Sequence, residues 1–264
     1  MIKENAFDRY AEDYDQYFTT APGVSFHRSM IHRYLQSNIL IREGMDILEL
    51  NCGTGEDALF FGLANQNVLA TDNSAEMIKI AKRKCLDLQN VKFLQLDIND
   101  LQLLESDSRF DLIFSNFGGL NCLDNDGMKF LMDSSARLLN HGGRFIAILM
   151  PRYALWELGY FLLHGQINNA FRRRTGYAEV LLHGFRVPVW YYSPQRIKSI
   201  AATHFHCHGC FPVGLFSPPV GAALNRSGRI LSDISDILDR ICWKITSFSG
   251  ISDHYLIDLE AYHK

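Results

Sequence analysis

Short apolar runs alternate with helical stretches between residues 46 and 150. The runs expected to be strands cover residues 45–50, 68–71, 91–96, 110–115 and 144–149, and the expected helices cover 56–63, a stretch from 73 and 127–139. Asn73 is expected to cap the second of these helices, with Glu76 at its third position. Because strands that alternate with helices at this spacing form βαβ units, the pattern predicts a parallel sheet covered on both faces.

The pattern changes after Pro151. Residues 152–174 are rich in aromatic and apolar side chains and helical in character, whereas 187–194 indicate an extended segment or a turn. Apolar positions between residues 225 and 245 recur at the spacing of an amphipathic helix. Two further short strands are expected, within residues 204–211 and 254–259.

The composition limits the class of protein. The chain has 264 residues, of which 47% are hydrophobic, enough for one large core and too apolar for a disordered chain. With 26 Lys and Arg against 29 Asp and Glu, the net charge of −3 argues against nucleic acid as a partner. No apolar run approaches the roughly 18 residues of a membrane-spanning helix, and Met1 to Tyr17 lack the pattern of a secretory signal. We expect a soluble cytoplasmic protein without a transmembrane segment, and its oligomeric state stays open.

Six scattered cysteines indicate reduced thiols rather than a disulfide framework. Two of them, Cys207 and Cys210, form a C-x-x-C within the run from His204 to Cys210. That run lacks a second ligand pair at zinc-like spacing, so an ordinary strand is favoured over a metal site, and no metal is expected. In a regular strand, the thiols of Cys207 and Cys210 would lie on opposite faces, and the three histidines of the run would share one face.

A glycine loop joins the first strand to the first helix. The segment from Glu49 to Gly55 lets the backbone approach a ligand, with the helix N-terminus behind it. Gly53 and Gly55, followed by Ala58, also fit a dinucleotide fingerprint, so a nicotinamide or flavin enzyme has to be considered.

Acidic residues at three strand ends favour a different ligand. Glu49 is aimed into the loop, where a carboxylate would repel a pyrophosphate but would suit an ammonium or sulfonium group. Asp72 ends the second strand, where it can accept both hydroxyls of a ribose, and Asp97 ends the third, where it can meet an adenine amino group. A nucleoside with a cationic tail is S-adenosylmethionine, which we predict as the cofactor.

Five ordered motifs resemble those of the class I S-adenosylmethionine-dependent methyltransferases. They are Leu48 to Gly55, Ala70 to Ser74 with Met77, Leu94 to Ile98, Phe110 to Asn116, and Leu138 to Gly143. The resemblance covers roughly residues 5–150 and implies a doubly wound, mostly parallel seven-stranded sheet, Rossmann-like, whose last strand is antiparallel. The family usually has glycine where this chain has Asn51, a departure that we expect to tighten the loop.

The resemblance also implies which residues bind the cofactor. The loop would cradle the methionine part, Asp72 the ribose and Asp97 the adenine, with Asn116 closing over the cofactor. A helix near the N-terminus would lie over it and present a tyrosine to the methionine end. The expected cofactor-binding set is Tyr10, Tyr14, Glu49, Leu50, Asn51, Cys52, Gly53, Gly55, Asp72, Asn73, Met77, Asp97, Ile98, Asn116 and Phe117.

A general base is needed only if the methyl acceptor must lose a proton, as a phenol or an alcohol would. The topology of the family would bring Asp253 and His254 to the mouth of the pocket, and His27 lies in the N-terminal cover. His254 and His27 are therefore the candidate catalytic residues, although a surface or hydrogen-bonded role is the alternative for both.

The segment 152–171 has three interpretations: a helix packed on the core, an apolar lid over an aromatic or acyl substrate, or a helix on a membrane surface. The arginines at 172–174 are either solvated or a docking site for an acyl-carrier protein. The expected parts of the chain are an N-terminal helical cover (1–40), a cofactor-binding core (41–150), a helical lid insertion (151–203), and a C-terminal strand pair with a helical insertion (204–264).

We therefore expect an enzyme that methylates a small or lipid-like molecule at oxygen. The alternatives are a methyltransferase acting on a substrate bound to an acyl-carrier protein, and a non-catalytic protein that binds S-adenosylmethionine or a dinucleotide. Where the family's DNA-methylating enzymes have Asn or Asp followed by two prolines and an aromatic residue, this chain has Asn116-Phe-Gly-Gly, which argues against nucleic-acid methylation.

Overall fold

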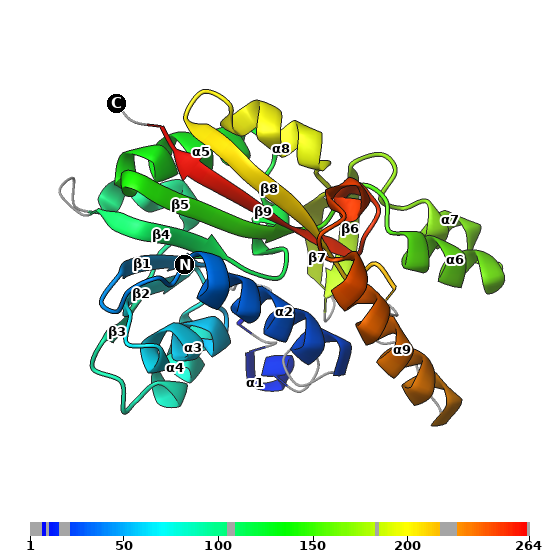
Figure 1. The fold of residues 1–264 in the computed structure, drawn as a ribbon, viewed down its shortest axis with the longest axis horizontal. Coiled ribbons are helices and arrows are strands. Elements are labelled where there is room, and N and C mark those ends of the chain that lie inside the picture. Colours follow the sequence, from blue (N-terminus) through cyan, green and yellow to red (C-terminus); the bar gives the residue numbers. More distant parts are fainter. Residues whose placement is uncertain are drawn as a thin grey trace.

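A seven-stranded sheet forms the centre of the molecule in a computed structural model that describes residues 7–8, 11–15, 22–104, 109–182, 185–216 and 226–262 (Figure 1). In spatial order its strands are β3 (Val91–Gln95), β2 (Asn67–Asp72), β1 (Asp46–Leu50), β4 (Phe110–Ser115), β5 (Leu139–Leu149), β9 (His254–Ala261) and β8 (Phe205–Val213). Only β9 runs antiparallel to its neighbours β5 and β8. The predicted sheet, with its last strand antiparallel, is confirmed.

Helices cover both faces of this sheet (Figure 1). One face packs against α2 (Pro22–Asn38), α3 (Glu56–Leu63) and α4 (Ala75–Lys84), through buried side chains such as Ile31 and Phe61. The other face packs against α5 (Asn125–Leu138), α8 (Pro194–Ala201) and the short helix η2 (Ile98–Leu103). Two apolar layers therefore hold the strands, and the carboxyl ends of the parallel strands are left as an edge on which loops can build a site.

The N-cap predicted for α4 is wrong by one residue. Ser74, not Asn73, has the extended backbone of a cap, and its hydroxyl accepts the amide proton of Met77 at 3.2 Å. The side chain of Asn73 instead reaches across to Asp97 on the next strand end. The residue directly before the helix is therefore the cap, and Asn73 makes a tertiary contact instead.

Strand β5 begins at Leu139, five residues before the start that the glycines suggested. Gly142 and Gly143 therefore lie within the strand, and the pairing register shifts opposite them, between Phe110 and Leu112 of β4. A glycine pair in a strand is a common mark of such an irregularity, so the pair indicates a bulged strand rather than a loop.

Strand β8, at the edge of the sheet, contains a second register shift, between Cys207 and Gly209. Cys207 pairs with Leu259 and Cys210 with Ile257, two residues apart on β9 and therefore on one face of the sheet. The expectation that the two thiols lie on opposite faces is wrong, because His208 is an extra residue in the strand. His204 precedes the strand, and no cluster of three metal-ligating side chains occurs among the residues that the structure describes.

The insertion between β5 and β8 contains helices and a hairpin. Helix α6 (Leu155–Leu163) and the short α7 (Ile167–Ala170) project beyond the sheet, followed by the hairpin of β6 (Tyr177–Leu182) and β7 (Phe185–Trp190) (Figure 1). The sequence predicted an extended segment or a turn over residues 187–194 and did not predict the hairpin, whose second strand contains Pro188. Both strands of a two-stranded sheet are edge strands, and an edge strand tolerates proline.

Large apolar side chains of α6 and of α9 (Arg226–Cys242) face solvent. Leu163 at the end of α6 is 89% exposed, Ile167 at the start of α7 is 61% exposed, and Ile241 on α9 is 67% exposed. The interpretation of 152–171 as a helix packed on the core is therefore wrong for this side of α6. No helix within the described part of the chain is both long and apolar enough to cross a bilayer.

A buried ion-pair network fixes the insertion to the rest of the protein. Arg173 is 6% exposed, and its guanidinium lies between the carboxylates of Glu157 on α6 and Asp253, just before β9. It also donates to the backbone oxygen of Asp253 at 3.0 Å. Arg172 also donates a hydrogen bond from Nε to Oε1 of Glu157 at 2.9 Å. The arginine run is thus not simply solvated, because its central member is a buried link between the insertion and the sheet.

We expect Glu157→Ala to lower the free energy of unfolding by about 3 kcal/mol, because it leaves Arg173 buried with one carboxylate fewer. The matched control is Glu179→Ala on β6, whose pair with Arg186 is solvent-exposed and worth about 0–1 kcal/mol. Urea denaturation measures both values, and limited proteolysis of residues 152–174 reports local loosening. Equal values for the two variants would contradict a structural role for the network.

Candidate active site

The carboxyl ends of β1 to β4 meet at one edge, which brings Glu49, Asp72, Asp97 and Asn116 together. The Asp72 carboxylate accepts the amide protons of Gly53 and Ser74, each at 2.9 Å. Burial raises the pKa of Asp72, although these amides oppose the shift. Asp72 therefore ties the glycine loop to the start of α4.

Left-handed backbone conformations shape the glycine loop. Asn51, Gly53 and Gly55 have φ angles of 54°, 53° and 82°. Asparagine is one of the few residues besides glycine that adopt this conformation readily, which explains how Asn51 replaces the glycine usual in the family. Space is made for its side chain by Gly119, where a Cβ atom would lie 2.7 Å from that of Asn51. The departure at Asn51 is thus accommodated by a glycine from the loop after β4.

Glu49 is the unusual member of this edge. Its side chain is 2% exposed, and its Oε2 atom has no hydrogen-bond partner in the described structure. Burial raises the pKa of Glu49 well above its usual range, and the negative charge of Asp57 adds to the shift. A buried carboxyl group without a partner is costly unless a cation binds there. The site therefore fits a ligand with a positively charged group, and fits a pyrophosphate poorly.

Asp57, in the first turn of α3, was not predicted from the sequence. Its carboxylate lies 2.5 Å from Arg28 and 2.6 Å from His32, both on α2, and accepts from Asn116 at 2.9 Å. Burial alone would raise the pKa of Asp57, but these donors, Arg28 foremost, hold it below its usual value. Asp57 thereby links helix α2 to Asn116 at the end of β4. An acid two residues after Gly55 was the available signal, but nothing local indicated its partners.

The short helix α1 (Ala11–Tyr14) lies beside the glycine loop. A Cβ atom on Gly53 would lie 3.8 Å from Cε1 of Tyr14, and Asp15 accepts a hydrogen bond from Thr54. Asp8 accepts from Ser74 at 2.6 Å. The described residues around Tyr14 are therefore bonded both to the glycine loop and to the start of α4, whereas Tyr10 lies outside the described residues.

The other predicted cofactor ligands divide into two groups. Leu50, Cys52 and Met77 are 0%, 7% and 2% exposed, so their side chains belong to the interior, and burial raises the pKa of the Cys52 thiol well above its usual value. Asp97 caps η2 by accepting from Asn99 at 2.9 Å, with Ile98 buried beside it. Of these five residues, Asp97 is the one that offers a carboxylate at the carboxyl ends of the strands.

Phe117, directly after β4, has a left-handed backbone with a φ angle of 47°. Its amide donates to the side-chain oxygen of Asn116 at 2.8 Å, and the Arg28 guanidinium lies 4.7 Å from the ring centroid. A bulky residue in this conformation is strained, and such strain is typical of functional sites. The 6.2 Å edge contact of its ring with His254 connects the cofactor edge to the start of β9.

Two histidines meet next to this edge. His254 Nδ1 lies 2.9 Å from Asp253, whose pKa is held down by His254 and Arg173 although its burial would raise it. Burial lowers the pKa of His27 to about 4, and its Nε2 atom has no hydrogen-bond partner in the described structure. The ring of His27 abuts the backbone of Gly214, where a Cβ atom would lie 2.5 Å from Cε1. The two predicted catalytic candidates, His27 and His254, therefore lie near each other. His254 is hydrogen-bonded to a carboxylate, whereas His27 is buried without a partner for Nε2 among the described residues.

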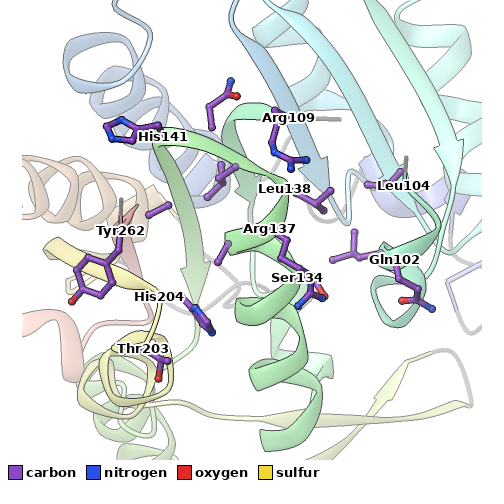
Figure 2. Close-up of a pocket in the computed structure, with 15 residues that line it drawn as sticks. Gln102, Leu104, Arg109, Ser134, Arg137, Leu138, His141, Thr203, His204 and Tyr262 are labelled. Atoms are coloured by element: carbon purple, nitrogen blue, oxygen red, sulfur yellow. The ribbon is translucent and has the colours of Figure 1, made fainter. Parts of the chain in front are cut away.

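A hollow of about 1110 Å³ lies elsewhere on the described surface (Figure 2). It is lined by Arg109 before β4, Leu139 at the start of β5, His204 before β8 and Tyr262 after β9. All four positions lie at the amino ends of the parallel strands, opposite the acidic edge. This hollow therefore takes no part in the candidate active site.

Comparisons with known proteins agree with the geometry. A family model described as a methyltransferase domain matches residues 47–143. The chain is 24% identical over 180 residues to a probable cobalt-precorrin-6B C(15)-methyltransferase (decarboxylating) of Thermoplasma acidophilum, over 63% of this chain and 86% of that protein. It is 31% identical over 154 residues to a malonyl-acyl-carrier-protein O-methyltransferase of Hamiltonella defensa, over 58% of this chain but only 54% of that protein.

A solved structure shares the fold over nearly the whole chain. An S-adenosylmethionine-dependent methyltransferase from Clostridium acetobutylicum superimposes with a TM-score of 0.59 at 16% identity, covering 97% of this chain and 99% of its own. The matched family model, the named relatives and the sheet order agree with one another. The chain contains a methyltransferase domain over residues 47–143, and the relatives and the shared fold support a class I S-adenosylmethionine-dependent methyltransferase with S-adenosylmethionine as its cofactor.

Proposed function

We propose that the enzyme methylates an oxygen atom of a small, largely apolar acceptor, with His254 as the general base. The observation that carries this proposal is the Asp253–His254 pair beside Phe117, at the edge where the cofactor-binding residues converge. A base is needed for a phenol or an alcohol, which must lose a proton, and not for an acceptor that is already ionised.

The cofactor is proposed to lie along the strand ends with its positive groups toward Glu49. Asp72 would hold the ribose hydroxyls, Asp97 and Ile98 would flank the adenine, and Tyr14 would cover the methionine end. When bound, S-adenosylmethionine supplies a methyl group already activated by its positive sulfur. The protein then has to align the acceptor in line with that group and keep water out.

His254 suits the role of base better than His27. The ionised Asp253 carboxylate can only accept, so Nδ1 of His254 donates this hydrogen bond and Nε2 is the ring nitrogen that would accept a proton from the acceptor. Nε2 makes no hydrogen bond to any described residue. His27, whose pKa burial lowers to about 4, is too weak a base to compete, and we propose that it packs against the Gly214 turn.

An apolar hollow supports an aromatic or lipid-like acceptor. It has a volume of about 270 Å³ and is lined by Leu155, Trp156, Leu215, Phe216, Phe248 and Ile251. Ile251 lies three residues before His254 and accepts the Leu155 amide proton at 2.9 Å, so the hollow adjoins the start of β9. We propose that this surface of α6 acts as the lid under which the apolar part of the acceptor binds.

An acid carried by an acyl-carrier protein is the second candidate, favoured by the relative named a malonyl-acyl-carrier-protein O-methyltransferase. A carboxylate acceptor would need no base, so His254 would be dispensable. The arginine run offers less support, because Arg173 is buried and Arg172 pairs with Glu157. Labelled methyl uptake by phenols, alcohols, fatty acids and carrier-bound acids distinguishes the two candidates.

We expect Asp72→Ala to weaken binding of S-adenosylhomocysteine about 10- to 100-fold, the worth of one or two hydrogen bonds to a charged acceptor. Asp46→Ala, at the opposite end of β1, is the control and leaves binding unchanged. Isothermal titration calorimetry measures both affinities. Wild-type affinity in the Asp72 variant would contradict the ribose assignment.

Binding of S-adenosylmethionine is expected to tighten as the pH rises and to release a proton. The raised pKa of Glu49 means that its carboxyl is protonated up to a higher pH in the free protein, whereas a bound cation favours the ionised form. By the same linkage, the free protein loses stability as the pH rises through that pKa. Calorimetry in buffers of different ionisation enthalpy counts the released proton, and Glu49→Gln should abolish it.

Replacing His254 by glutamine should lower kcat for a phenol or alcohol acceptor by about 10²- to 10⁴-fold, while the affinity for S-adenosylhomocysteine stays unchanged. Asp253→Asn should lower kcat as well, because it removes the charge that orients the imidazole. His27→Gln is the matched control, with a smaller loss. A fully active His254→Gln enzyme would point to an acceptor that is already ionised.

A further inference from the structure

The bulge in β8 places two thiols side by side, although their spacing in the sequence would separate them. Cys207 and Cys210 stand opposite Leu259 and Ile257 of β9, on the face covered by α8. Two residues of strand span about 6.8 Å, close to the widest Cα separation that a disulfide bridges, roughly 4.4–6.8 Å. The bulge bends the strand at this point, which brings such a pair nearer.

The two thiols differ in exposure and in environment. Cys210 is 2% exposed, whereas Cys207 is partly exposed at the edge of the sheet. The pKa of Cys207 is lowered to about 7, first by hydrogen bonding with the Cys210 thiol and also by the charge of Lys198 on α8, while partial burial opposes the shift. The same interaction raises the pKa of Cys210. Cys207 therefore has the properties of an attacking thiolate and Cys210 those of a second, resolving thiol.

Other cysteines provide an internal comparison. Cys85 is 4% exposed, and Cys122 is partly buried. Burial raises the pKa of both thiols to about 11. At neutral pH these thiols are almost entirely protonated and therefore unreactive. Only the pair on β8 combines a nearby second thiol with a lowered pKa among the cysteines of the described residues for which a shift is resolved.

We propose that Cys207 and Cys210 are an oxidisable dithiol, which a low-molecular-weight disulfide converts into an intramolecular disulfide. The Cys207 thiolate attacks one sulfur of the small disulfide, whose S–S bond breaks and releases one small thiol. Cys210 then loses its proton to solvent and attacks Sγ of Cys207, displacing the second small thiol. Two protein thiols are oxidised, and one small disulfide is reduced to two thiols.

The test treats the full chain with oxidised glutathione at pH 7, blocks the remaining thiols by alkylation, and maps the products by mass spectrometry. We expect a Cys207–Cys210 disulfide without bound glutathione, formed on the order of 10- to 100-fold faster than any glutathione adduct of Cys122, since thiolate fraction outweighs the lower nucleophilicity of an acidic thiol. Glutathione retained on wild-type Cys207, a different linkage, or equal reaction at Cys122 would overturn the proposal.

Variants identify the attacking thiol. Cys210→Ser should trap glutathione on Cys207, Cys207→Ser should lose the fast reaction, and Cys242→Ser should behave like the wild type. Cys210→Ala serves as a second variant, and circular dichroism checks that each variant is folded. If folded Cys210→Ser and Cys210→Ala both fail to retain glutathione on Cys207, the assignment of Cys207 as the attacking thiol is wrong.

Discussion

A carboxyl group buried without a partner is the constraint around which the candidate site is organised. Glu49 is held at the end of β1, 2% exposed, beside the ionised Asp57. An unpaired buried charge is costly, so the free protein keeps this group with a raised pKa, and a cation is the ligand that relieves the cost. The surrounding chain preserves this situation, because Arg28, whose charge acts on Glu49, pairs with Asp57 at 2.5 Å. A stability cost in the free protein is thereby coupled to binding of a positively charged cofactor.

The cofactor side and the acceptor side are connected through a few shared residues. Arg28 bonds to Asp57 and also lies over the ring of Phe117, which contacts His254 at its edge. His254 bonds to Asp253, and Asp253 pairs with Arg173 of the insertion. A continuous set of contacts thus runs from α2, past the carboxyl ends of the parallel strands, to the insertion. The acceptor would bind where helix α2, strand β9 and the insertion meet, which explains why the proposed base is far from the glycine loop in the sequence.

The sequence predicted the parts of the fold that depend on local pattern. Strand β1, the glycine loop and α3 follow from an apolar run, a pair of glycines and a helix-forming stretch, and β9 was expected as a short strand over residues 254–259. Features that depend on tertiary contacts were missed. Ser74 caps α4 while Asn73 bonds to Asp97. His208 is accommodated as a bulge through pairing with β9, and Asp57 pairs with Arg28 and His32 on a separate helix. The hairpin of β6 and β7 was hidden by Pro188, which only an edge strand tolerates.

A crystal structure of the complex with S-adenosylhomocysteine tests the central claim most directly. The account predicts that the ammonium group lies within hydrogen-bond distance of the Glu49 carboxylate, with the ribose hydroxyls on Asp72 and the adenine beside Asp97. A complex in which Glu49 keeps no cationic partner, or in which the ribose lies away from Asp72, would contradict it.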